Sequence, residues 1–196
     1  MAPTPLTPTT GLLTLSSPQG SRSNPGRRPR CAGGLGTLLL LKSMMIEISI
    51  DETKTNLHAD LIFRIPEAGI DKRFDLYYFA VDQDAFPDVD PLVELLKYWI
   101  EKISSLGAGE TGFFPIDFSD EYTGCLKVSR INREHLLLAY GNSRMNGFSV
   151  SPSQPKNYYK EVQDFEFDDE TIPLTVDRDR FLNELKILKE KTENGT

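Results

Sequence analysis

The chain has 196 residues, of which 39% are hydrophobic and 26% are charged, and its formal net charge is −7. That length suits one domain with some additional sequence. No apolar stretch reaches the roughly 18 residues that a membrane-spanning helix needs, so we do not expect this chain to be an integral membrane protein. Two cysteines and two histidines are too few for a disulfide framework or for most metal sites. We therefore also expect no metal and no other cofactor.

The composition changes near residue 44. Residues 1–44 hold five basic and no acidic residues, together with six of the 13 prolines and six of the 14 glycines. Such a segment buries too little apolar surface to offset its conformational entropy. We predict that residues 1–44 form a disordered basic extension that is dispensable for folding, with Met44 or Met45 as the functional start. A transit peptide and a secretory signal are the alternatives.

Residues 45–196 are predicted to form a single acidic domain, with 17 basic and 29 acidic residues and a net charge of −12. Its first elements are strands. Ile46, Ile48 and Ile50 alternate with polar residues, and residues 57–65 show the same period of two. This pattern predicts two half-buried antiparallel strands joined by the polar loop 51–56. We interpret the aromatic run 74–81 as a third strand, buried on both faces.

The clearest predicted helix covers residues 90–106. Asp90 is a suitable N-cap and Pro91 suits the first turn. Apolar residues then recur at helical spacing until Gly107, which is typical of a residue that ends a helix. Trp99 lies in this apolar stripe, so we expect it to anchor the core.

Strand patterns return after this helix. Residues 113–118, 125–130 and 135–140 give the stronger signals, and residues 148–151, 162–168 and 171–176 give weaker ones. Asp177 is predicted to cap a closing helix that extends to Lys191. The connections are short and resemble hairpins, which favours antiparallel pairing. We predict an α+β fold: an antiparallel sheet of about six to eight strands, with the mid-chain helix and the C-terminal helix packed on it.

The sequence offers little catalytic chemistry. It has no glycine-rich nucleotide loop in residues 45–196. His58 shares a predicted strand face with Asp60, a pair that could orient a general base, but a solvated surface histidine is the preferred interpretation. His135 is interpreted as a structural residue at a strand start. Cys125 has no basic neighbour that would lower the pKa of its thiol, so we expect a core residue. We predict that the protein is not an enzyme.

The acidic cluster Asp82, Asp84, Asp88 and Asp90 begins like a calcium-binding loop. Phe86 and Pro87 replace the third ligand and the glycine, and Val93 stands where the loop needs a glutamate. We interpret the cluster as a solvated loop before a helix N-terminus, where carboxylates are favourable. Asp82 and Asp84 remain candidate contacts for a partner.

A second acidic segment is the main candidate site. Asp164, Glu166 and Asp168 alternate with Phe165 and Phe167, so a strand that buries the two aromatics would turn the carboxylates outward together. Asp169 and Glu170 extend this face. Such a surface would repel nucleic acid and anionic lipid and would attract a basic partner protein. We therefore expect no nucleic acid and no membrane among the partners.

The segment 141–160 is irregular and Pro-containing, and it ends in Tyr158 and Tyr159. Two adjacent tyrosines there could anchor a partner. The alternative, which we prefer, is that one tyrosine caps the core and the other lies on the surface.

The layout and acidity of residues 45–196 resemble those of the small acidic immunity proteins of bacterial polymorphic toxin systems. The similar features are the opening strand hairpin, the helix 90–106, the strands from Phe113 to Val176 and the closing helix. This resemblance implies a cytoplasmic, non-catalytic protein that binds and blocks a cognate toxin domain. It carries no site residues across, because no diagnostic motif is present.

Two other functions stay open on the sequence. An acidic secretion chaperone would bind a disordered effector segment, usually as a dimer. A small enzyme would need a pocket that joins His58, His135 or the cluster Asp82–Asp90. We expect a monomer or a weak homodimer that binds a basic protein.

Overall fold

The computed structural model describes residues 44–51, 59–145, 147–156 and 158–195. All of them belong to the second of two compact units, Leu41–Thr196. The predictions made for residues 1–43, for the loop between the first two strands and for His58 lie outside the described residues.

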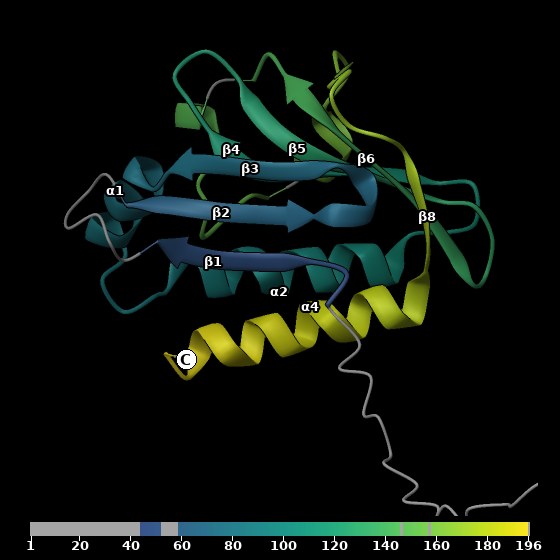
Figure 1. The fold of residues 1–196 in the computed structure, drawn as a ribbon. Helices are drawn as coiled ribbons and strands as arrows, with labels where there is room; N and C mark the ends of the chain where they lie inside the picture. Colours follow the sequence, from purple (N-terminus) through teal and green to yellow (C-terminus); the bar gives the residue numbers. More distant parts are fainter. Residues whose placement is uncertain (1–43, 52–58, 146, 157, 196) are drawn as a thin grey trace, which may run out of the picture. The chain divides into compact units, whose positions relative to one another are not determined.

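The described chain is an α+β fold with two antiparallel sheets, which confirms the predicted fold class (Figure 1). The three-stranded sheet consists, in order, of β1 (Glu47–Asp51), β2 (Asp60–Ile65) and β3 (Ile70–Asp75). The five-stranded sheet consists of β4 (Thr111–Phe118), β5 (Thr123–Arg130), β6 (His135–Ser143), β7 (Glu166–Phe167) and β8 (Leu174–Asp177). β7 and β8 pair with opposite ends of β6.

Two long helices follow the predicted pattern. In α2 (Pro91–Ser105), the Asp90 carboxylate accepts hydrogen bonds from the backbone N–H groups of Leu92 and Val93 at 2.9 and 3.1 Å. In α4 (Arg178–Glu193), the Asp177 carboxylate accepts one from the N–H of Arg180 at 2.7 Å. Both caps satisfy N–H groups that the first turn of a helix leaves open. The two helices lie side by side (Figure 1).

The core joins both sheets to α2 through aromatic side chains. Trp99 of α2 is fully buried, as predicted. Its ring lies 6.3 Å from that of Phe63 on β2 and 5.9 Å from that of Phe114 on β4, centroid to centroid. The Tyr140 ring of β6 lies 6.1 Å from the Phe63 ring. Residues from four separate elements, β2, α2, β4 and β6, thus share one core.

The prediction of a strand at residues 74–81 is wrong. The third strand ends at Asp75, and Tyr77–Ala85 forms the helix α1. The Asp75 carboxylate accepts a hydrogen bond from the Tyr77 N–H at 2.8 Å, which helps to start the helix. Tyr78, Phe79 and Asp82 are the buried residues of α1. Asp82 follows Tyr78 by four residues and Phe79 by three, which is helical spacing, but the run 74–81 ends before Asp82 and does not show it.

Two of the weaker strand predictions also differ from the structure. Residues 148–151 are not a strand, and Gly147–Ser149 forms a 3₁₀ turn, η2. In the predicted strand 162–168 only Glu166–Phe167 pairs with β6. The remaining short elements are the 3₁₀ turn η1 (Pro66–Ala68) and the four-residue helix α3 (Tyr158–Glu161).

Candidate functional site

The second acidic segment lies at and around β7, at an edge of the five-stranded sheet. We call its five acidic residues the acidic strap: Asp164, Glu166, Asp168, Asp169 and Glu170. This edge approaches β6 closely, because a Cβ atom added at Gly141 would lie 2.1 Å from the carbonyl oxygen of Glu166. Phe165 is half-buried and packs on Phe113 with ring centroids 5.4 Å apart, but Phe167 is 39% exposed. The expectation that both aromatics are buried is therefore wrong. A strand of two residues does not impose the alternation that a longer strand would.

Two cations counter part of the strap. Lys72 of β3 lies 2.8 Å from the Asp168 carboxylate and 3.4 Å from that of Glu170. Arg144 lies 2.9 Å from the Glu166 carboxylate, and its backbone N–H donates to Asp164 at 3.1 Å. Burial would raise the pKa of Asp168, but hydrogen bonds from Lys72 and from the Glu170 N–H outweigh it, so the pKa is lowered.

Asp168 differs from the other four carboxylates of the strap. Its side chain is only 16% exposed and is fastened to Lys72, so it positions the strap instead of facing outward as predicted. Asp164, Glu166, Asp169 and Glu170 are exposed. The strap therefore presents four carboxylates to solvent on a segment that Asp168 ties to the three-stranded sheet.

The two aspartates predicted at the 82–90 cluster have different environments. Asp82 is buried, and its carboxylate accepts hydrogen bonds from the Ser151 hydroxyl at 2.7 Å and the Ser153 N–H at 2.8 Å. It ties the loop 151–153 to α1 and offers no surface to a partner, which corrects that prediction. Asp84 is exposed on the outer side of α1 and stays a candidate contact.

The two tyrosines also separate. Tyr158 is 1% exposed, and its hydroxyl lies 3.1 Å from that of Ser143. Its side chain is therefore part of the core, which removes Tyr158 from the candidate partner contacts. Tyr159 is half-buried against Tyr98, with ring centroids 6.3 Å apart. Lys102 and Lys160 lie over the Tyr159 ring. This is the arrangement of the preferred alternative, with one tyrosine in the core and one near the surface.

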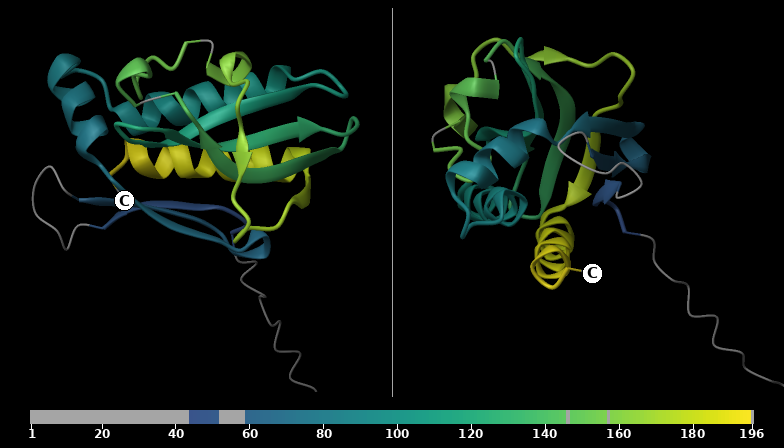
Figure 2. Two further views of the ribbon diagram at one scale, coloured as in Figure 1. Left: turned by 90° about the horizontal axis from the view of Figure 1, so that it is seen from above. Right: turned by 90° about the vertical axis from the view of Figure 1, so that its left-hand side faces the viewer.

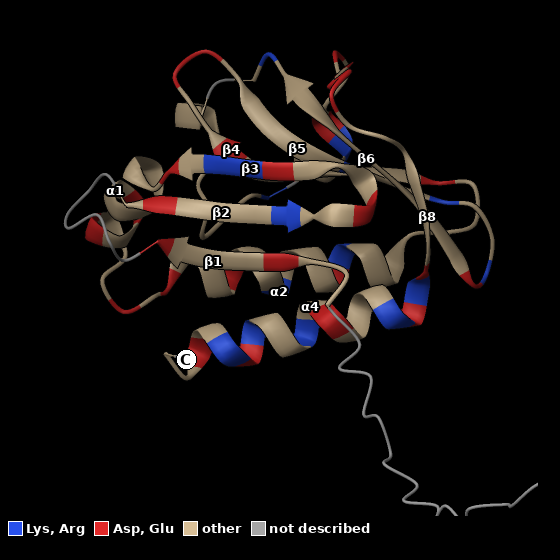
Figure 3. Cartoon of the chain, viewed as in Figure 1, with Lys and Arg blue, Asp and Glu red and all other residues tan. Residues whose placement is uncertain are grey.

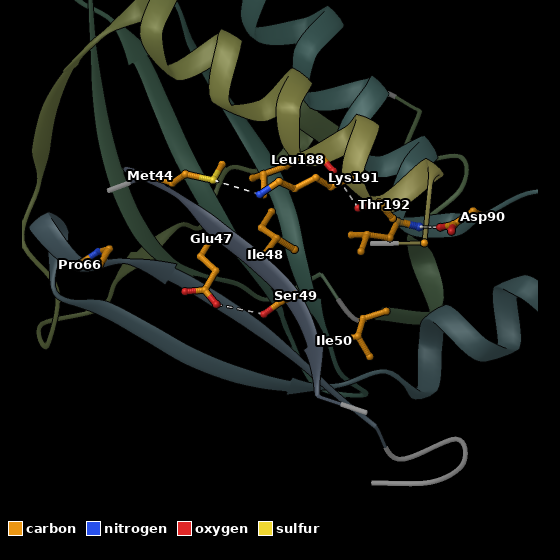
Figure 4. A pocket seen from close by; sticks show the side chains of 12 residues that line it. Met44, Glu47, Ile48, Ser49, Ile50, Pro66, Asp90, Leu188, Lys191 and Thr192 are labelled. Atoms are coloured by element: carbon orange, nitrogen blue, oxygen red, sulfur yellow. Dashed lines mark hydrogen bonds between the residues drawn. The ribbon is translucent and has the colours of Figure 1, made fainter. Parts of the chain in front are cut away.

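A groove of about 740 Å³ runs between β1 and α4 (Figure 4). The side chains of Ile48 and Leu188 face it, and its lining contains neither histidine nor cysteine. Polar groups there are engaged with the fold: Asp90 caps α2, and Lys191 lies 3.8 Å from the sulfur of Met44. The groove also holds a hydroxyl beside a carboxylate, since the Ser49 hydroxyl donates to the Glu47 carboxylate at 3.3 Å, and Glu47 in turn lies 3.4 Å from the guanidinium of Arg64.

Cys125 and His135, the other described residues that we considered for catalysis, lie in surroundings that suit a structural role. Cys125 is buried, as expected, and burial raises the pKa of its thiol to about 12. The thiolate that a nucleophile needs is therefore disfavoured. His135 is half-buried, with Nδ1 3.2 Å from the side-chain oxygen of Asn132.

Asp117 of β4 is a buried carboxylate that predicts a pH-dependent stability. Burial raises its pKa to about 6, although a hydrogen bond from Tyr122 opposes the shift. An unfolded aspartate titrates near 3.9. Folding is therefore favoured by the protonated form, and this contribution is lost as the pH rises from about 4 to about 6. The expected loss is about 2–3 kcal/mol, at 1.36 kcal/mol for each pKa unit.

The variant Asp117→Asn cannot ionise, so it should lose less stability over that range than the unmodified protein does. Urea unfolding at pH 4, 5, 6 and 7 measures the difference. Asp84→Asn, at an exposed position of α1, is the matched control. If the unmodified protein and Asp117→Asn show the same pH profile, the carboxylate does not titrate as its burial requires.

The sequence interpretation missed one group of surface residues. Phe148 on η2 is 71% exposed, and Tyr77 and Val81 on α1 are 41% and 45% exposed. Figure 2 shows η2 beside α1, although the two are far apart in the sequence. No local pattern could reveal these residues, since apolar side chains in short runs are normally expected inside.

Among the residues that the structure describes, no group of three or more histidine, cysteine or acidic side chains is placed to hold a metal ion. None of the described helices combines the length and apolarity needed to cross a membrane. No protein-family model, no curated protein and no solved structure matches this chain.

Proposed function

We propose that this protein is a non-catalytic binding protein for a basic partner protein, and that it acts as an immunity protein that neutralises a cognate toxin by direct contact. A cytoplasmic location is part of the proposal. The observation that carries it is the acidic strap, where four carboxylates are exposed and the ion pairs of the strap come from Lys72 and Arg144.

The chemistry of the strap favours a cationic protein over other partners. Like charges on adjacent residues repel one another, and a cation-rich surface relieves that repulsion. The same charges disfavour phosphate backbones and anionic lipid. Opposite charges on a partner speed the encounter, an effect that salt weakens.

Charge reversal at the strap is the test. The variant Asp169→Lys with Glu170→Lys changes two exposed carboxylates. It gives up the 3.4 Å contact of Lys72 with Glu170 and keeps the 2.8 Å Asp168–Lys72 pair that holds the strap. We expect it to fold normally and to associate about tenfold more slowly at low salt with the purified product of the neighbouring gene. The difference should shrink at high salt. Association rates at two ionic strengths measure it.

The control is Glu190→Lys with Glu193→Lys, which makes the same change of net charge near the C-terminal end of α4, where both residues are exposed. The control removes the ion pair of Glu193 with Lys189, while lysines are favourable at that end of a helix, so we expect it to stay folded. If both variants slow association equally, only net charge acts and the strap is not the binding surface.

A further inference from the structure

A second surface lies where α1 and η2 meet, and its residues are distinct from the acidic strap. We define the α1 surface by Tyr77, Val81 and Asp84 of α1, Phe148 of η2, and Asp120 with Glu121 in the turn between β4 and β5. Tyr77, Val81 and Asp84 recur at positions i, i+4 and i+7, so they share one helix face. Tyr78 connects the aromatics, with its ring 5.5 Å from that of Tyr77 and 5.1 Å from that of Phe148.

Phe148 is held firmly although its side chain is exposed. The Gly147 N–H donates to the Ser119 carbonyl at 2.5 Å, and the Val150 N–H donates to the Gly147 carbonyl at 3.1 Å. The approach requires glycine, because a Cβ atom at residue 147 would lie 2.8 Å from the Ser119 carbonyl oxygen. Phe148 is the aromatic residue of this turn, and 71% of its surface is exposed.

Further bonds join the pieces of the α1 surface. The buried Asp82 carboxylate ties the residues after η2 to α1 through Ser151 and Ser153. The Tyr78 hydroxyl donates to the Asp120 carboxylate and so links α1 to the turn between β4 and β5. Exposed aromatics on a fastened support lose little conformational entropy on binding, which is how protein-binding hot spots are built.

The charged residues that we assign to the α1 surface are all acidic. They come from residues 74–96 and 103–126, and neither range contains a lysine or an arginine. Asp84, Asp120 and Glu121 are exposed at the α1 surface. The nearby Arg73 of β3 is already paired with Asp51 at 2.8 Å and with Asp60 at 3.5 Å. Figure 3 shows acidic residues at the α1 end of the described structure.

We propose that the α1 surface docks an arginine-rich segment of a protein partner, with guanidinium groups on the Tyr77 and Phe148 rings and against the carboxylates of Asp84, Asp120 and Glu121. Arginine fits better than lysine because its planar guanidinium group stacks on aromatic rings and forms two parallel hydrogen bonds with a carboxylate. The acidic domain of a second copy, residues 45–196, would bring like charges together, and nucleic acid or anionic lipid would be repelled.

The probe is a synthetic arginine-rich peptide, titrated into the full chain and followed by its affinity and by the backbone amide signals in NMR spectra. We expect the largest signal shifts at Tyr77, Val81 and Phe148. Phe148→Ala should weaken binding about fivefold, the size of one cation–π contact, without changing the urea midpoint. A lysine-rich peptide of equal charge should bind more weakly than the arginine-rich one.

The matched control is Ile172→Ala, which truncates a side chain that is 64% exposed outside the α1 surface and should leave the affinity unchanged. Equal affinities for the unmodified protein and Phe148→Ala, or signal shifts confined to the acidic strap, would overturn the proposal. The strap variant Asp169→Lys with Glu170→Lys should still shift the same amide signals at the α1 surface. This result would distinguish a failure of the proposed binding at the acidic strap from a failure of the proposed binding at the α1 surface.

Discussion

Replacing Trp99 with alanine should lower the free energy of unfolding by about 3–5 kcal/mol, the cost of emptying a large buried aromatic site. The ring is fully buried and contacts Phe63 of one sheet and Phe114 of the other. Its indole N–H donates to the Pro115 carbonyl at 3.2 Å, and that carbonyl would lose its partner. Both sheets and α2 would therefore lose packing at once.

Trp99 is the only tryptophan in the chain, so circular dichroism is the appropriate signal for the urea unfolding curves. Trp99→Phe is the graded control, since it keeps one ring and loses the hydrogen bond. We expect its effect to be smaller than that of Trp99→Ala. A loss below about 1 kcal/mol in the alanine variant would be inconsistent with a buried ring that joins the sheets.

Glu184→Ala should lower the free energy of unfolding by about 2–4 kcal/mol, since it leaves buried hydrogen-bond donors without an acceptor. The Glu184 carboxylate accepts bonds from the backbone N–H groups of Met45 and Ile46 at 2.5 and 3.2 Å. It also lies 3.0 Å from the guanidinium of Arg180. This one side chain of α4 fastens the start of β1.

Glu184→Gln keeps a side-chain oxygen and should cost less than Glu184→Ala. Glu190→Ala, at an exposed position of the same helix, should stay within about 0.5 kcal/mol of the unmodified protein. Urea unfolding measures all three, and hydrogen exchange at Ile46 reports the local effect. Unchanged exchange in Glu184→Ala would mean that other contacts hold the strand.

The sequence predicts those elements whose signals are local. For α2, the N-cap, the proline and the apolar spacing lie within one segment, and the observed helix agrees with the prediction to within a residue at each end. The run 74–81 carries too few residues to distinguish a helix from a buried strand. Pairing with β2 decides the end of β3, where Asp75 lies opposite Asp60, and the residues of the run 74–81 do not show this pairing.

The candidate site was only partly predictable for the same reason. The carboxylates of the strap are adjacent in the sequence, but Lys72, which fastens Asp168, comes from another sheet. Burial of Asp82 and Tyr158 depends on Ser153 and Ser143, which the fold brings to them. The exposure of Phe148 follows from the close fit of Gly147 against Ser119, which no local pattern encodes.

The central claim, that this chain neutralises a basic partner by direct binding, is tested most directly by the mass of the complex. The full chain and the purified product of the neighbouring gene would be mixed and measured by analytical ultracentrifugation. We expect a one-to-one complex of the two folded proteins. Separate sedimentation at micromolar concentrations, or a dimer of this chain bound to one extended segment, would contradict the proposed function; the second result would indicate a secretion chaperone instead.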